Sequence, residues 1–182
     1  NPSQAWINGS LANKVVAHEM GHNFGLYHSN AWECGAETLG SSCSSVEYGD
    51  SVDTMGNPSS GHFNAFQKER LGWLNYGSSP PITTVQTSGV YTLDPYETAT
   101  TNPKALKILK STDATTGQNT WYYVEFRRPV GFDSFVSNNS NVLNGVVIHT
   151  GSESSANSSY LLDMTPGTSS WSDPALAVGQ SF

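Results

Sequence analysis

Three histidines and one glutamate near the start of the chain have the spacing of a catalytic metal site. The segment from His18 to His28 follows the pattern H-E-x-x-H-x-x-G-x-x-H. Because His18 and His22 are four residues apart, a helix projects both from one face, where they can bind one cation. Glu19 lies about a third of a turn to the side, where it can accept a proton from a water bound beside it.

The third histidine favours a catalytic metal site over a structural one. Gly25 can adopt a positive φ and end the helix, so the chain can turn and bring His28 to the same cation. Three protein ligands leave the fourth tetrahedral position for water, which is typical of catalytic zinc. A short His-Glu-His pattern is equally compatible with an ordinary solvated helix face, but Gly25 and His28 at these offsets favour the metal site.

A methionine further along the chain fits the same kind of site. The segment Ser51–Asn57 is a small polar turn in which Met55 is the large apolar side chain. Taken alone, Met55 is a residue that fills a gap in the core. After a three-histidine signature, it is similar to the methionine of the turn that lies beneath the zinc site in metzincins.

Together these motifs resemble those of metzincin zinc endopeptidases, and the chain is most similar to the gametolysin-type family. The resemblance covers nearly the whole chain, although only the zinc motif and the methionine turn carry chemistry. The further matching strings are Tyr48–Asp50, Thr54–Gly56, His62–Phe66, Leu71–Leu74, Tyr122–Arg127, Gly131–Asp133 and Leu161–Gly167. Astacins and serralysins place a tyrosine ligand two residues after the methionine; this chain has Asn57 there, so we expect no tyrosinate ligand.

The resemblance implies a secreted metalloendopeptidase that hydrolyses extracellular proteins or glycoproteins. The implied roles are zinc ligation by His18, His22 and His28, and general-base catalysis by Glu19. Two alternatives stay open: a non-catalytic adhesion or binding module that retains a metalloprotease-like fold, and a zinc hydrolase acting on another kind of bond. The presence of Glu19 with the complete ligand set favours the peptidase.

Composition narrows the classes of partner. The 182 residues include only 13% charged side chains and carry a formal net charge of −7, which disfavours nucleic acid and anionic membranes as partners. No apolar run reaches the roughly 18 residues that a membrane-spanning helix needs. Few residues precede the zinc motif, so we expect a fragment that further segments of the same precursor complete.

The two cysteines, Cys34 and Cys43, flank a loop rich in Gly and Ser. We expect a local disulfide, whose closed loop would contribute roughly 2.5–3 kcal/mol in the chain-entropy model. Two buried free thiols are the alternative, whereas a thiolate zinc site is disfavoured because the spacing matches no ligand pattern. A disulfide would place the protein in an oxidising compartment, in agreement with secretion.

Acidic residues are frequent in the loop after the zinc motif: Glu33, Glu37, Glu47, Asp50 and Asp53. Calcium could bind there through carboxylate oxygens, but a solvated loop is the alternative because no spaced ligand pattern is present. Asp50 and Asp53 could instead fix the methionine turn by side-chain to backbone hydrogen bonds. We expect structural roles for the other two histidines, His62 at a helix start and His149 at the end of a strand.

Residues 1–76 form the predicted metzincin catalytic region. Apolar residues at helical spacing predict a helix over Leu11–Phe24, capped by Ser10 or Asn8. The disulfide loop and the methionine turn follow, and His62–Leu74 is predicted as a second helix.

Residues 77–182 form the predicted β-rich C-terminal domain. Short alternating runs separated by Gly, Asn, Pro and Ser favour an antiparallel, sandwich-like arrangement. The runs are Ile82–Gln86, Val90–Leu93, Ala105–Leu109, Trp121–Phe126, Val146–His149 and Tyr160–Leu162, and Ala177–Phe182 is predicted as a further strand. The predicted fold class is therefore α+β: the lower half of a metzincin domain followed by an antiparallel β-sandwich-like domain.

Overall fold

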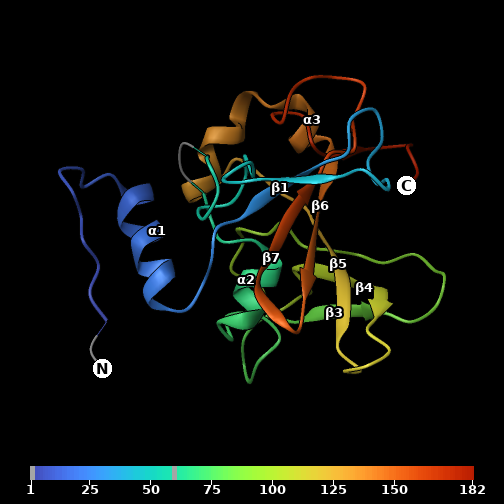
Figure 1. The fold of residues 1–182 in the computed structure, drawn as a ribbon, viewed down its shortest axis with the longest axis horizontal. Coiled ribbons are helices and arrows are strands. Elements are labelled where there is room, and N and C mark those ends of the chain that lie inside the picture. Colours follow the sequence, from blue (N-terminus) through green and yellow to red (C-terminus); the bar gives the residue numbers. More distant parts are fainter. Residues whose placement is uncertain (1–2, 59–60) are drawn as a thin grey trace.

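The strands within the described residues, 3–58 and 61–182, join one mixed sheet in the computed structural model (Figure 1). In chain order the elements are α1 (Asn13–Asn23), β1 (Asn30–Glu33), β2 (Ser44–Val46), α2 (Ala65–Arg70), β3 (Ile82–Val85), β4 (Ala105–Thr112), β5 (Asn119–Glu125), the 3-10 helix η1 (Gly131–Asn138), α3 (Ser140–Leu143), β6 (Gly145–Ser152), β7 (Ser155–Leu162) and β8 (Leu176–Ala177). A sheet core with few helices confirms the α+β class in its coarse form.

The strand order across the sheet is β2-β1-β7-β6-β5-β4-β3, and β8 pairs with β6. Strands β4 to β7 pair antiparallel, but β3 pairs parallel with β4, and β1 pairs parallel with β7. Within residues 77–182 the antiparallel prediction therefore holds for β4 to β8 but not for β3, and a sandwich is not confirmed. Parallel pairs need long crossover connections, and residues 86–104 provide one between β3 and β4.

The sheet includes strands from both predicted regions, 1–76 and 77–182. Strand β1 pairs with β7 through Ala31 and Leu161, both fully buried. The division of the chain into these regions stays a prediction about where the chemistry lies.

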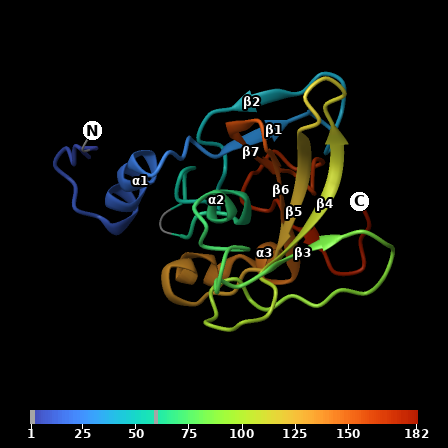
Figure 2. The ribbon, with the colours of Figure 1, turned by 90° about the horizontal axis from the view of Figure 1, so that it is seen from below.

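Helix α1 is shorter than predicted and lies at the outer side of the molecule in both views (Figures 1 and 2). It begins at Asn13, after an Ala12 N-cap that forms no side-chain cap; the Ser10 hydroxyl accepts only the Ala12 N–H, at 3.4 Å. Gly25 has a φ of +88° and the Leu26 N–H donates to the Gly21 carbonyl, which ends the helix as predicted.

Helix α2 occupies only the middle of the predicted segment His62–Leu74. Its side-chain cap is Asn64, which accepts the N–H of Gln67, while His62 forms a β-bridge with Asp53 instead of opening the helix. The helix packs on β5 and β6 through Phe66. No side chain fits at Gly151 in β6, because a Cβ there would overlap the Phe66 ring.

The run Val90–Leu93 was wrongly predicted as a strand. It lies in the connection between the parallel strands β3 and β4, and Val90 is fully exposed. Near the end of the chain, β8 covers only Leu176–Ala177, less than the strand predicted over Ala177–Phe182.

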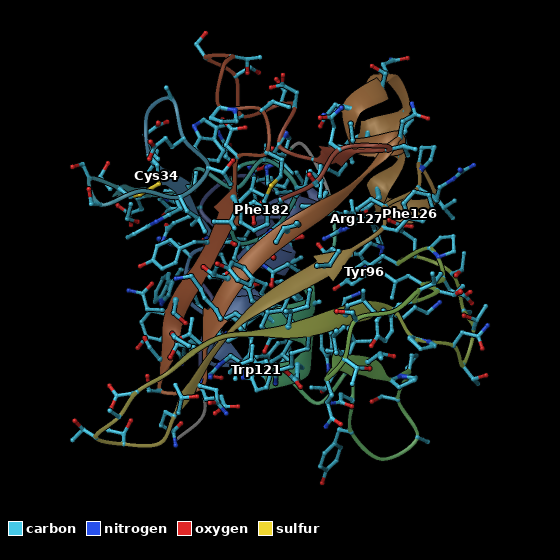
Figure 3. The ribbon with its side chains drawn as sticks, turned by 90° about the vertical axis from the view of Figure 1, so that its right-hand side faces the viewer. Cys34, Tyr96, Trp121, Phe126, Arg127 and Phe182 are labelled. Atoms are coloured by element: carbon cyan, nitrogen blue, oxygen red, sulfur yellow. A yellow bond between two sulfur atoms is a disulfide. The ribbon has the colours of Figure 1, made fainter. Side chains whose placement is uncertain are left out.

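Cys34 and Cys43 form a disulfide between β1 and β2, visible beside the Cys34 label in Figure 3. The bridge closes the connection between these two antiparallel strands. It therefore restrains the segment after β2, which approaches the three-histidine motif. Among the described residues, no helix combines the length and apolar character needed to cross a bilayer.

Candidate metal centre

The three histidines of the motif converge in space. His18 and His22 come from α1, and His28 comes from the segment after Gly25. The ring centroids are 4.9 Å apart for His18–His22 and His22–His28, and 5.4 Å apart for His18–His28. One potential ligand atom from each ring lies within 4.8 Å of the others. Helix periodicity sets the first pair, and the turn at Gly25 brings in the third ring.

Each of these rings has its Nδ1 atom occupied by an oxygen. His18 Nδ1 lies 2.9 Å from the Thr54 carbonyl, His22 Nδ1 2.9 Å from the Leu26 carbonyl, and His28 Nδ1 2.9 Å from Glu47 Oε1. These oxygens accept, so each neutral ring carries its proton on Nδ1 and its lone pair on Nε2. Three neutral imidazoles with available Nε2 atoms suit zinc, whose histidine ligands typically donate the other N–H to such an acceptor.

The pKa of His18 is displaced in the direction that favours metal binding. Burial lowers this pKa, and the neighbouring His22 and His28 lower it further, against an opposing hydrogen bond to Thr54. A neutral ring at neutral pH is the form that binds a cation.

Glu19 follows His18 on α1 and is partly exposed. Its charge slightly opposes the lowering of the pKa of His18 and adds to the raising of the pKa of Tyr48. Glu19 therefore lies near the imidazoles.

The turn around Met55 lies against α1. Met55 is fully buried, and a Cβ on Gly21 would overlap its sulfur atom. The carbonyl of Thr54, next to Met55, is the acceptor for His18. The turn thus contacts the helix and also orients one of the three rings.

Two buried aspartates hold this turn from within. Asp53 accepts the N–H groups of Met55 and Asn64, and Asp50 accepts the N–H of Val52 at 2.8 Å. These are the side-chain to backbone hydrogen bonds expected for Asp50 and Asp53. Their carboxylates are therefore engaged in the turn.

Asp50 also links the turn to the sheet. Its Oδ2 lies 2.8 Å from His149 Nε2 and accepts the Ser29 hydroxyl at 2.7 Å. Burial opposes ionisation, but the His149 charge and the hydrogen bonds outweigh it and lower the pKa of Asp50. Burial likewise opposes the charge on His149, and Asp50 outweighs it to raise that pKa. His149 is thus a strand residue, as expected, but one that forms a buried ion pair.

A second buried ionic group supports the adjacent segment. Arg127 donates to Glu125 and Asp133, both at 2.7 Å, and its guanidinium lies 4.2 Å from the centre of the Tyr96 ring. Figure 3 shows Arg127 and Tyr96 side by side. Glu125 accepts the first N–H of α2, from Ala65, at 3.0 Å. The group therefore fixes the start of α2 behind the methionine turn.

His62 lies outside the three-histidine cluster. Its Nδ1 is 3.5 Å from Lys68 Nζ. Burial, and then the charge of Lys68, lower the pKa of His62 to about 4. This neutral, half-buried side chain packs near Tyr96 and Phe132.

The acidic residues of the loop after α1 do not gather into one cluster. Glu47 pairs with His28, Glu33 accepts the N–H of Gly35 at 2.7 Å, and Asp50 and Asp53 are buried in the turn. In the part of the chain that the structure describes, the histidine triad is the one group suited to a metal. A calcium site is therefore not supported.

Two hollows flank α1 on different faces. A polar cleft of about 430 Å³ borders the triad and is lined by His22, Tyr27, His28, Asn30, Ser45, Glu47 and Asn157. An apolar hollow of about 270 Å³ involves Ala17, Met20 and Phe132 but none of the three histidines. Only the first can deliver a ligand to the candidate metal centre.

Sequence reasoning named the three rings and Glu19 but missed what surrounds them. Glu47 was identified only as one of several acidic loop residues, and His149 only as a strand residue. The partners of His28 and Asp50 lie 19 and 99 residues away in sequence. No short sequence motif predicts such pairs.

Residues 3–29 match a family model described as metallo-peptidase family M12B, reprolysin-like. The matched segment contains α1 and all three histidines, and it supports a metzincin-like peptidase. Comparison with curated proteins gave no match, and comparison with solved structures gave none either.

Proposed function

We propose that this protein is a secreted zinc endopeptidase of the gametolysin type that hydrolyses peptide bonds in extracellular proteins or glycoproteins. The observation that carries the proposal is the convergence of His18, His22 and His28, each with Nδ1 occupied and Nε2 available. A polar cleft of about 430 Å³ lies beside the triad and is lined in part by His22 and His28. The disulfide supports an extracellular location.

Zinc bound by these rings would act as a Lewis acid that polarises the scissile carbonyl and acidifies water. Glu19 accepts one proton from the attacking water as its oxygen adds to the carbonyl carbon. Glu19 then returns this proton to the leaving nitrogen as the C–N bond breaks. The products are a carboxylate and an amine, and Glu19 is regenerated.

The methionine turn and the β-rich region have supporting roles in this proposal. The Met55 turn holds α1 and the Thr54 carbonyl that orients His18. Residues 77–182 supply the sheet on which the turn is fixed, chiefly through His149. The chemistry is assigned to residues 1–76.

The test is cleavage of casein or gelatin by the wild-type protein and by Glu19→Gln, with and without 1,10-phenanthroline. We expect chelation to abolish wild-type cleavage. Glu19→Gln should retain zinc, measured by elemental analysis, while kcat falls by several orders of magnitude because the general base is lost. Glu37→Gln, the same change at an exposed loop glutamate, is the matched control and should retain activity.

Two results would reject the peptidase. A wild-type protein that binds zinc but cleaves neither substrate would leave the two alternatives, a binding module that retains the fold or a zinc hydrolase acting on another kind of bond. Cleavage that continues at the wild-type rate in Glu19→Gln would remove Glu19 as the base.

A further inference from the structure

Tyr48 lies directly on the candidate metal centre, although it belongs to neither the zinc motif nor the methionine turn. Its ring centroid is 3.9 Å from that of His28, with a 35° angle between the planes. It is also 5.9 Å from the His18 ring at 25°. The phenol therefore borders the side of the cluster formed by these two rings.

The backbone of Tyr48 is in a conformation that few residues adopt. Its φ is +59°, in the left-handed region that residues other than Gly, Asn and Asp rarely adopt. Such conformations persist where the surrounding structure enforces them, and they are frequent at functional sites. In this case the conformation points an aromatic ring at the imidazoles.

Neighbouring groups enforce this conformation. The Tyr48 N–H donates to Asn30 Oδ1 at 3.2 Å, and the Gly49 N–H donates to the Val46 carbonyl at 3.0 Å. A Cβ on Gly49 would lie 2.5 Å from the Ala31 methyl group. The turn is thus packed tightly on β1, which defines the position of the ring.

The hydroxyl of Tyr48 is available to a ligand. Within residues 3–58 and 61–182 it forms no hydrogen bond that would occupy it, and the residue is 41% exposed. A phenolic hydroxyl can donate a hydrogen bond.

Peptide hydrolysis needs a donor at this place. When water adds to the scissile carbonyl, negative charge develops on the carbonyl oxygen, and a positioned hydrogen-bond donor stabilises it. Glu19 cannot serve, because it receives the proton of the water. Tyr27 lines the polar cleft, but among the described residues it is the ring of Tyr48 that stacks on the triad.

We propose that Tyr48 is a catalytic residue whose hydroxyl donates a hydrogen bond to the oxyanion that develops on the substrate carbonyl. The inference rests on the proposed peptidase function. Tyr48 transfers no proton in this role, so the proton balance through Glu19 is unchanged.

The variant Tyr48→Phe tests this role, because it keeps the ring on His28 and removes only the hydroxyl. We expect kcat to fall about 10²- to 10³-fold, the range for loss of one oxyanion donor. KM and zinc content should change little. Tyr76→Phe, which removes the hydroxyl of a tyrosine that is 75% exposed and lies outside the cleft lining, is the matched control and should retain kcat.

A binding measurement separates the donor role from loss of structure. A phosphinic peptide carries a tetrahedral anionic centre in place of the scissile carbonyl, and its affinity is measured by calorimetry. We expect Tyr48→Phe to weaken this peptide by a factor similar to the loss of kcat, while the affinity for the product peptide stays the same.

Three outcomes would overturn the proposal. Wild-type kcat and wild-type phosphinic-peptide affinity in Tyr48→Phe would show that the hydroxyl is not used. Loss of zinc, or equal weakening of the phosphinic and product peptides, would show that Tyr48 only supports the site. A wild-type protein that cleaves no peptide would reject the proposed function itself and Tyr48 with it, and this result is visible before any variant is made.

Discussion

At the scale of single residues, orientation of the imidazoles is as important as their number. Two of the three Nδ1 atoms lie against backbone carbonyls, of Thr54 and Leu26, which no side-chain substitution removes. Only His28 depends on a side chain, that of Glu47. The third ring is therefore the one whose orientation can be tested by mutation.

Glu47→Ala is expected to weaken zinc binding about 10- to 100-fold, the usual effect of removing a hydrogen-bond partner from a ligand histidine. Glu47 is largely exposed, with 72% of its side chain accessible, so the lower end of this range is expected. Competition with a chromogenic chelator measures the affinity. Glu37→Ala should leave it unchanged, and an unchanged affinity in Glu47→Ala would exclude Glu47 as the partner that orients His28.

At the scale of elements, the contact between α1 and the methionine turn leaves no spare volume. Gly21 is the buried residue of α1, and it lies against the sulfur of Met55. Phe63 closes the same contact, since a Cβ on Gly21 would lie 3.1 Å from its ring. Gly21 lies within the helix, so no turn requires a glycine there. Its lack of a side chain instead allows Met55 and Phe63 to pack close to the backbone of α1.

Gly21→Ala is expected to destabilise the protein by about 1–3 kcal/mol. An alanine in a helix would normally gain about 1 kcal/mol over glycine, but the added methyl group overpacks against a methionine that is fully buried. Urea unfolding measures the change in the free energy of unfolding.

The double variant Gly21→Ala, Met55→Ala is the control for this contact. Against the Met55→Ala background the same glycine substitution should be neutral or stabilising, because the space has been emptied. Equal effects in both backgrounds would contradict the packing explanation.

At the scale of the whole molecule, buried ionic contacts join segments that are far apart in sequence. Asp50 and His149 fix the turn to β6, while Arg127 joins Glu125 of β5 to Asp133 of η1. Breaking a buried pair of this kind by removing one partner typically costs about 3–5 kcal/mol. The position of the metal site therefore depends on titratable groups in the region assigned no chemistry.

Stability is expected to fall as the pH rises above about 6.5. The pKa of His149 is raised in the folded protein, so its stabilising effect is complete below the ordinary value of 6.5 and is lost as the pH passes the raised value. Asp53 acts in the same direction but over a lower range: burial and then Asp50 raise its pKa to about 8, so its contribution falls as the pH rises from the ordinary value of 3.8 to about 8. The lowered pKa of Asp50 acts only at the acid end, where its stabilisation is lost as the pH falls below about 3.8.

Urea midpoints at several pH values measure this dependence, with His149→Gln as the comparison. Glutamine can still donate to Asp50 but carries no charge, so the variant should be less stable and its midpoint should vary less with pH. An identical pH dependence in both proteins would assign the effect to other groups, such as the three histidines of the metal centre.

The sequence by itself determined the local features. The spacing of His18 and His22 follows from the helical repeat, and the turn that brings in His28 follows from Gly25, because both depend only on neighbouring residues. The coarse α+β class also followed from local patterns, and the pairing of Cys34 with Cys43 agreed with their closeness in the chain. The catalytic roles of these residues stay predictions.

The tertiary structure decided how these features are combined. It alone placed β1 parallel to β7, Glu47 against His28, Tyr48 on the imidazoles, and Asp50 beside His149. Each of these depends on segments that are distant in sequence and meet only when the sheet forms, so no short pattern encodes them. The helical repeat and the turn at Gly25 can present three imidazoles to one point, but the orientation of each ring is set by the groups that fold against it.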